Sequence, residues 1–359
     1  MSTYQIFDRE NDVVENQRTT ISSGLWTGGA GTLTAAFTQS TNGNITGSFL
    51  DIYNEDPNLS SSAEIQYGVG YAHFDGSGSA GNTTKLTSGG RQSKALYSQF
   101  RNVLLAPNTE KFEFTSSPTA SGDKDFYFVS FQRARQREKI DPGNWELHLA
   151  GAMPAGDTKD SKVKLIDDSG ATTNVTVNQG GRVFNVVSGS IADGIKVTAA
   201  AETTFGSYGL FYPDLGIILL NAKMAELSGG LAANPRSADT FDNRPQAFYN
   251  SLKSGSYFAA RREEEISSVS YFARARNDQF NFSSNPTYST GSKVAKSGGG
   301  FDVTTGLFKV PSFQGDPRAY ITQVGLYDDN SDLLAVAKLS QPILKSFSRE
   351  AVVKVKLDY

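Results

Sequence analysis

The alternation of apolar and polar residues is clearest near the C-terminal end of the sequence. Over residues 319–327 the side chains alternate between two faces with the period of a β-strand. Residues that favour tight turns follow at 328–332, and a second apolar run occupies residues 333–339. This succession predicts a β-hairpin. We expect one face of its first strand to carry Tyr320, Thr322, Val324 and Leu326.

The last residues of the sequence show the same period. Four apolar side chains alternate there with charged ones: Val353, Val355, Leu357 and Tyr359. We expect all four to be buried on one face of a final strand, with the charged side chains between them facing solvent. A strand of this kind forms part of a core, so we expect its removal to unfold the domain that contains it.

Strand patterns recur along most of the chain, and helical patterns are few. Alternating or short apolar runs predict strands at residues 4–14, 32–37, 46–53, 65–74, 126–133, 145–149, 162–167, 173–177, 182–187, 195–198, 215–220 and 266–276. Helical spacing predicts helices over 93–105 and 237–252, and Gly/Ser-rich stretches predict long loops at 75–90 and 290–300. We therefore predict a mainly β fold, with antiparallel β-sandwich-like domains and a few short helices.

Changes in composition along the chain suggest three regions. We predict an N-terminal β domain over 1–150, an inserted α+β subdomain over 151–255, and a C-terminal β region over 256–359 that packs with the N-terminal domain. Two Arg-x-Arg motifs at predicted strand ends, 133–135 and 274–276, support a pairing of the two outer regions. Each motif precedes a turn that contains proline.

The helix predicted over 93–105 has an apolar stripe and a polar side. Leu96, Phe100, Val103 and Leu104 form the stripe, which predicts packing on a sheet. An alternative interpretation concerns the polar side, where Tyr97 and Arg101 would contact a neighbouring subunit. The arginines of the two Arg-x-Arg motifs are further interface candidates: Arg133, Arg135, Arg274 and Arg276. For the first motif, acidic neighbours favour the alternative of an ion-paired or solvated strand edge.

Composition and charge narrow the classes of protein. The chain of 359 residues is 38% hydrophobic and 20% charged, with a net charge of −3. Because the basic residues are dispersed, we expect no nucleic-acid partner. The sequence has no cysteine, no signal-peptide pattern at its start and no apolar run of membrane-spanning length. We therefore expect no thiolate metal site and no membrane partner.

Residues that support catalysis are sparse. His73 and His148 are the two histidines, and neither lies in a metal-binding or nucleophile motif. The acidic pairs at 167–168 and 328–329 are typical turn residues. Two alternatives stay open: a glycosidase needs just two carboxylates, and the side-chain oxygens at alternate positions of 328–332 match part of a calcium-binding loop. The G-x-G-x-x-G at 76–81 has no helix after it, which favours a loop. We expect no enzyme activity, cofactor or metal.

Several segments resemble a family of virion structural proteins from T4-like contractile-tailed phages, especially those of cyanobacteria. The segments are ALYSQFRN at 95–102, DPGNWEL at 141–147, YGLFYPD at 208–214, FNFSSNP at 280–286 and VGLYDD at 324–329. They are spread over most of the chain and consist of packing and turn motifs. The resemblance implies a tail or baseplate component and carries over no active-site residue.

These observations lead to one expected function and one alternative. We expect a non-enzymatic structural protein of a phage tail baseplate, of the wedge or its periphery, that is assembled in the host cytoplasm and located in the virion. Its partners would be other tail or baseplate proteins and further copies of itself. The alternative is a glycan- or receptor-binding tail module, which would need exposed aromatic side chains.

Overall fold

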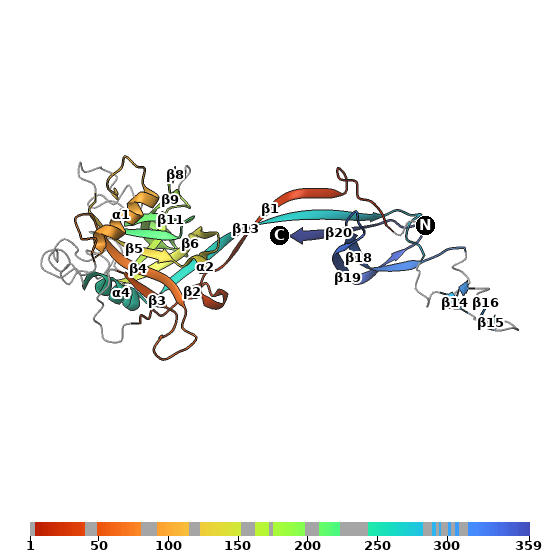
Figure 1. Cartoon of the computed structure of the whole chain (residues 1–359), viewed down its shortest axis with the longest axis horizontal. Helices are drawn as coiled ribbons and strands as arrows, with labels where there is room; N and C mark the ends of the chain where they lie inside the picture. Colours follow the sequence, from red (N-terminus) through yellow and green to blue (C-terminus); the bar gives the residue numbers. More distant parts are fainter. Residues whose placement is uncertain are drawn as a thin grey trace. The chain divides into compact units, whose positions relative to one another are not determined.

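The protein is mainly β in the computed structural model (Figure 1). The structure describes residues 4–39, 49–79, 92–114, 123–151, 162–171, 175–197, 208–222, 243–282, 289–291, 294–295, 301–302, 306–308 and 315–359. Strands make up 52% and helices 13%, and the large sheets are antiparallel. The predicted fold class is therefore confirmed.

Helices are short in the described residues, and strands dominate. The helices are α1 (Ser93–Leu104), α2 (Arg133–Gln136), α4 (Asn243–Gly255) and the 3-10 helix η1 (Thr27–Gly29). The strands are β1 (Val13–Gly24), β2 (Thr32–Leu33), β3 (Phe49–Tyr53), β4 (Ile65–His73), β5 (Asp125–Phe131), β6 (Lys139–Ala150), β7 (Lys162–Asp167), β8 (Thr176–Asn178), β9 (Gly181–Ser190), β10 (Gly194–Val197), β11 (Gly209–Tyr212), β12 (Ile217–Asn221), β13 (Phe258–Ala275), β14 (Ser289–Gly291), β15 (Val294–Ala295), β16 (Phe301–Asp302), β17 (Gly306–Phe308), β18 (Ala319–Tyr327), β19 (Leu333–Lys345) and β20 (Ala351–Asp358).

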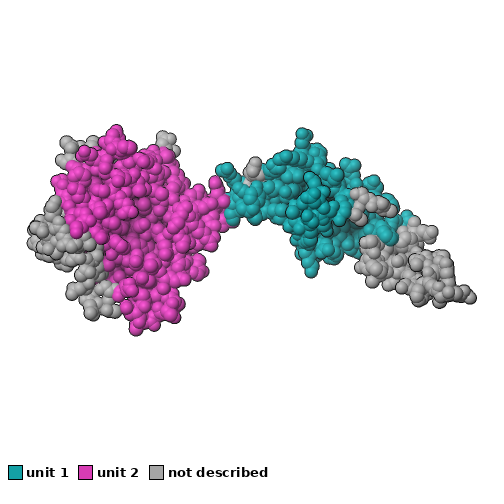
Figure 2. Space-filling view, in the orientation of Figure 1, with its two compact units in different colours: residues 1–19, 266–359 teal, residues 20–265 magenta. Residues whose placement is uncertain are grey.

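The chain divides into two compact units (Figure 2). Unit 1 comprises Met1–Thr19 and Ile266–Tyr359, and unit 2 comprises Thr20–Glu265. The chain passes from unit 1 into unit 2 within β1 and returns within β13, because both strands cross the division.

Unit 2 is built on one antiparallel sheet with the order β13-β6-β7-β9-β11-β12-β5-β4-β3. The sheet curls, because Phe258 of β13 contacts side chains from the far end of this order. Its ring centroid lies 5.3 Å from that of Tyr67 in β4 and 5.5 Å from that of Phe131 in β5. A single sheet therefore packs against itself across a core, which gives the sandwich-like layering.

Two apolar layers cover the two faces of this sheet. On the inner face, side chains of β3 to β13 form one core around the fully buried Trp145, and α4 adds Phe248 and Leu252. On the opposite face, α1 packs Tyr97 and Leu104 against β5, β11 and β12. Each large side chain buried in this way stabilises the fold by roughly 1.5–3 kcal/mol.

Unit 1 contains the second half of β13 and the C-terminal strands. β20 pairs antiparallel with β13 from Ser268↔Asp358 to Ala275↔Ala351. The hairpin β18–β19 packs on this pair through a small core around Leu326, Val353 and Val355. The predicted hairpin and final strand are both present.

The faces of these C-terminal strands differ from the prediction at two places. A register shift between Ile321 and Gln323 reverses the alternation in β18, so Tyr320 is exposed while Val324 and Leu326 face the core. Tyr359 follows the end of β20 and is also exposed, whereas Val353 and Val355 are buried as predicted.

The division into units differs from the three predicted regions. The strands β7, β9, β11 and β12, which come from residues 151–255, lie between β6 and β5 in the sheet of unit 2. Residues 151–255 are thus part of unit 2 and not a separate subdomain, and residues 256–359 are divided between the units within β13. Likewise β8 pairs with β9, and not with β7 in the predicted hairpin.

The segment around residues 133–144 also differs from the prediction. Residues 133–136 form the short helix α2, so the arginines there do not extend the preceding strand. β6 includes the predicted turn at 141–144, but its pairing with β13 is interrupted there, since Ile140 pairs with Arg262 and Trp145 with Ala260. Within this irregular stretch Gly143 adopts a positive φ of 79°, and its amide donates to the Asp167 carboxylate at 2.8 Å.

Both predicted helices are present, but their bounds or their buried side chains differ from the prediction. α1 has the predicted bounds to within one residue, but Val103 is exposed and Tyr97 is buried. α4 begins at Asn243, which places Pro245 in the first turn, where its missing N–H costs no helical hydrogen bond. Residues 237–242 of this prediction lie outside the described residues, as do residues 80–90 of the predicted loop over 75–90 and residues 292–293 and 296–300 of the predicted loop over 290–300. The described residues of the second predicted loop belong to β14 and β15.

Candidate functional site

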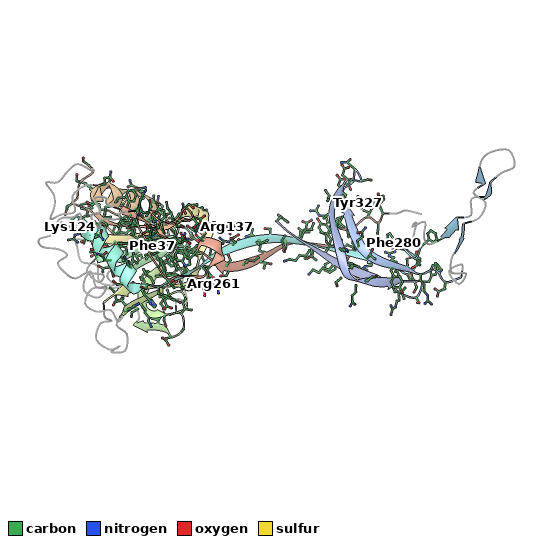
Figure 3. The ribbon with its side chains drawn as sticks, turned by 90° about the horizontal axis from the view of Figure 1, so that it is seen from below. Phe37, Lys124, Arg137, Arg261, Phe280 and Tyr327 are labelled. Carbon is green, nitrogen blue, oxygen red and sulfur yellow. The ribbon has the colours of Figure 1, made fainter. Side chains whose placement is uncertain are left out.

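A group of exposed apolar side chains lies on the hairpin of unit 1, and we call it the hairpin patch. It consists of Tyr4, Tyr327, Leu333, Leu334 and Val336, with exposed fractions from 43% to 69%. Figure 3 labels Tyr327 on this hairpin. The ring of Tyr4 meets that of Tyr327 edge-on at 5.1 Å, and Tyr327 pairs with Leu333 across the hairpin. Contiguous exposed apolar side chains are typical of interaction sites.

The shape of the hairpin patch follows from Gly325 and a β-bulge. The register shifts between Leu326 and Tyr327, which makes Leu334 an extra residue in β19. A Cβ atom at position 325 would lie 2.9 Å from Cε2 of Tyr327 and 3.4 Å from Cδ1 of Leu333. These two side chains therefore lie over the bare backbone of Gly325, so a larger residue there would displace the ring of Tyr327.

The strand that carries the hairpin patch is apolar on both faces. Residues 333–337 contain no polar side chain, which is typical of strands covered on both sides. Ala335 and Ala337 face the core of unit 1, whereas Leu334 and Val336 face outward and are exposed. In the described residues of unit 1, one apolar face of this strand is therefore covered and the other is not.

Charged residues lie at both ends of this outward row. The turn at one end contains Asp328, Asp329 and Asp332, and Lys338 lies at the other end. The turn is held by Asp328, whose Oδ1 accepts hydrogen bonds from the amides of Asn330 at 2.9 Å and Asp332 at 2.7 Å. The carboxylate thus acts as a turn residue. The described residues include no group of three or more His, Asp or Glu placed to hold a metal ion.

A buried lysine fixes the far end of β19. The Nζ atom of Lys345 donates to the carbonyl oxygens of Asn277 and Ser346, both at 3.1 Å, and to Oδ1 of Asn281 at 2.8 Å. Burial lowers the pKa of Lys345, against the opposing effects of Asp278 and Glu350. This contact joins the hairpin to the turn after β13, on which Figure 3 labels Phe280.

The structure places Tyr97 and Arg101 in internal roles. Tyr97 is buried, and its hydroxyl donates to the carbonyl oxygen of Asp123 at 2.8 Å and accepts from the amide of Phe112 at 3.2 Å. Burial also raises the pKa of Tyr97. The guanidinium of Arg101 donates to backbone carbonyls of the loop that follows α1. Tyr97 therefore lies in the core of unit 2. Whether Tyr97 and Arg101 contribute to an interface with a neighbouring subunit stays a prediction.

The four arginines of the Arg-x-Arg motifs are divided between the units. In unit 2, Arg133 is exposed and Arg135 pairs with the carboxylate of Glu64. In unit 1, Arg274 is exposed with its Nη2 at 3.8 Å from Oδ1 of Asp12, and Arg276 is exposed. In each pair one side chain is about half exposed, and ion pairs that are open to solvent in this way contribute little to stability, about 0–1 kcal/mol. Whether these arginines contact other subunits stays a prediction.

One histidine has a carboxylate partner that the sequence analysis missed. Nε2 of His148 lies 2.6 Å from Oε1 of Glu146, and the ring of His148 stacks on Tyr257 at 4.4 Å. Burial alone would raise the pKa of Glu146, but the bonds from His148 and from the amide of Ile191 lower it. The pair connects β6 to the turn after β9. Its signal is the Glu-x-His spacing, which puts both side chains on one face of a strand.

Cavities and comparisons add no further site. In the described part of unit 2, a cavity of about the size of one water molecule is lined by Tyr67, Leu252 and Tyr257 among others.

No described helix has the length and apolar character that a membrane crossing requires. Comparison of the chain with family models, with curated proteins and with solved structures finds no match.

Proposed function

We propose that the protein is a structural, non-enzymatic component of a contractile-tailed phage particle, in the tail or baseplate, and that unit 1 binds neighbouring subunits through the hairpin patch. The observation that carries this proposal is the outward apolar face of β19, where Leu334 and Val336 are exposed, opposite the face on which Ala335 and Ala337 pack in the core of unit 1. The resemblance of five segments of the sequence to phage virion proteins supports the tail as the location.

The distribution of apolar side chains supports unit 1 as the binding unit. Most of the large apolar side chains that are exposed in the described residues belong to unit 1, although unit 2 is the longer part of the chain. Burying each one fully against a partner contributes roughly 1.5–3 kcal/mol before the costs of association. A patch of this size supports modest affinity by itself, which suits a subunit held by several contacts at once.

The composition of purified particles tests this proposal. Particles of a phage that encodes the chain are separated by density gradient and analysed by quantitative mass spectrometry. We expect peptides of the chain at a constant ratio to the other tail proteins across the particle peak. A chain that is abundant in the lysate but absent from the particles would contradict the proposed function.

Exposed aromatic rings in unit 1 favour a second candidate function, the binding of host-surface glycans. Phe280, Phe282, Tyr320 and Phe347 are exposed at 41% to 65%. Aromatic side chains at a surface offer flat apolar faces to a ligand. Tyr320→Ala should then reduce binding of the purified protein to isolated host glycans and leave its content in particles unchanged. Equal glycan binding by the wild type and Tyr320→Ala would contradict this second function.

A further inference from the structure

A lysine amine and an asparagine carboxamide meet in the interior of unit 1. Lys345 is fully buried at the end of β19, and Asn281 is 5% exposed in the turn after β13. Nζ of Lys345 lies 2.8 Å from Oδ1 of Asn281. Because a C=O bond is about 1.23 Å long, the Cγ atom of Asn281 lies about 3–4 Å from Nζ, which is close to the separation of two reacting atoms before attack.

The two groups are held in this approach from both sides. Nδ2 of Asn281 donates to the carbonyl oxygen of Asn277 at 2.7 Å, while Oδ1 accepts from Lys345. Nζ of Lys345 also donates to the carbonyl oxygens of Asn277 and Ser346, each at 3.1 Å. Neither group can turn away without losing a buried hydrogen bond. A fixed approach of this kind raises the rate of reaction between the two groups.

The surroundings favour the reactive form of the lysine. A lysine attacks as the neutral amine, and burial lowers the pKa of Lys345, which increases the neutral fraction at a given pH. The carboxylates of Asp278, in the turn after β13, and Glu350, just before β20, act in the opposite direction. Both carboxylates are exposed, so solvent screens their effect. The buried position also keeps water away from the carboxamide, which limits competing hydrolysis.

We propose that Nζ of Lys345 attacks Cγ of Asn281 and forms an isopeptide bond within unit 1. The hydrogen-bonded pair described above is the reactant. The bond between Nζ and Cγ forms as the bond between Cγ and Nδ2 breaks, one proton of the neutral amine passes to Nδ2, and ammonia leaves. The product is a secondary amide, and the reaction needs no oxidant or other co-reactant.

The bond would fix the hairpin to the rest of unit 1. It joins the end of β19 to the turn after β13, and the two residues are 64 positions apart in the sequence. A link across so long a loop restricts the unfolded chain. Because the bond lies within one chain, this inference is independent of the proposed function.

Mass spectrometry of the full-length protein tests the bond directly. Purified wild type is incubated near neutral pH and at mildly alkaline pH. We expect its mass to fall by one ammonia with time, with a rate that rises about tenfold per pH unit while most of the lysine is charged. Trypsin should then release a branched peptide that joins residues 277–293 to residues 339–349, because the modified Lys345 is no longer a cleavage site. A wild type that keeps its full mass at both pH values would overturn the bond.

Substitutions distinguish this bond from other losses of ammonia. Lys345→Met and Asn281→Ala each remove one reactant, so neither variant should give the branched peptide. Asn277→Ala is the matched control, because the contacts of Asn277 with Lys345 and Asn281 come from its backbone carbonyl, and it should react like the wild type. An asparagine that cyclises onto its own backbone also releases ammonia but gives no branched peptide. Loss of ammonia without the branched peptide would therefore contradict the proposal, and this readout on the wild type decides the question even where a variant unfolds.

Discussion

Lys345 shows how a single buried residue fixes the hairpin that carries the proposed binding surface. Its ammonium group donates to three neutral oxygen atoms of Asn277, Asn281 and Ser346. A buried charge is costly unless its hydrogen bonds are satisfied, and these three contacts offset part of that cost. The sequence gives little sign of this role, because a lysine at the end of an apolar strand is more often exposed.

Replacing Lys345 by methionine should destabilise unit 1 by about 1–3 kcal/mol, because the three oxygen atoms lose their buried donor. Lys356→Met is the matched control, since Lys356 is exposed and pairs with Asp358 at the surface. The chain offers separate probes for the two units. Both of its tryptophans, Trp26 and Trp145, lie in unit 2, so circular dichroism should report the loss in unit 1 while tryptophan fluorescence is unchanged. Equal stability of Lys345→Met and Lys356→Met would show that the buried contact contributes nothing.

The lowered pKa of Lys345 also predicts a dependence on pH. Because the folded-state pKa lies below the ordinary value of 10.5, the unfolded chain binds this proton more tightly than the folded chain does. The free energy of unfolding should therefore rise with pH between the folded-state pKa and 10.5, relative to Lys345→Met. Denaturant unfolding of both proteins across this range measures the difference. A difference that shrinks as pH rises would mean that the pKa is raised.

Among the elements of unit 1, β20 joins the hairpin core to β13. Val353 and Val355 are buried in the core under the hairpin, against which Tyr271 of β13 also packs, and Leu357 is partly buried there. The strand therefore contributes to the surface on which the inner face of β19 packs. The hairpin patch keeps its geometry only while this support is present.

Deletion of residues 353–359 should unfold unit 1. It removes two buried valines at roughly 1.5–3 kcal/mol each, together with the backbone pairing to β13. Against a typical stability of about 5–15 kcal/mol for a domain, this loss is large. Circular dichroism should show reduced strand content, whereas the fluorescence transition of Trp26 and Trp145 should persist. A deletion variant with the full strand signal of the wild type would contradict this role of β20.

Local patterns predicted elements well where short-range pairing decides the structure. The hairpin β18–β19 and the strand β20 follow from period-two alternation and a turn-rich connection. The side chains that face outward were harder to predict, because register shifts in the hairpin reverse the faces at Tyr320 and make Leu334 an extra residue. The hairpin patch was missed for this reason. Tyr97 is buried because α1 packs against the sheet at this side chain. The spacing of residues within the helix carries no information about that contact.

At the scale of the whole molecule, the division into units depends on pairing between strands that are far apart in the sequence, which local patterns do not predict. The prediction of a subdomain over 151–255 relied on a change in composition, whereas the strands of that segment pair with β5 and β6 in the sheet of unit 2. In the same way β13 is one continuous strand that belongs to both units, so a boundary placed at residue 256 does not correspond to a gap between them. Unit 1 is thus assembled from both ends of the sequence.

The assignment of binding to unit 1 is the central claim, and competition within one infection tests it most directly. Cells that express the wild type and a tagged variant in equal amounts supply both chains to the same particles. Leu334→Ser/Val336→Ser changes the hairpin patch, and Val177→Ser in unit 2 is the control, because Val177 and Leu334 are both 69% exposed. Such exposed substitutions change stability by about 0.5 kcal/mol or less, so folding is preserved in both variants.

The measured quantity is the ratio of variant to wild type in purified particles, divided by the same ratio in the lysate. We predict a value near one for Val177→Ser and a decrease of about tenfold for Leu334→Ser/Val336→Ser, since its apolar contacts with the neighbouring subunit are lost. If both variants enter particles as well as the wild type does, the hairpin patch is not the surface that holds the protein in its assembly.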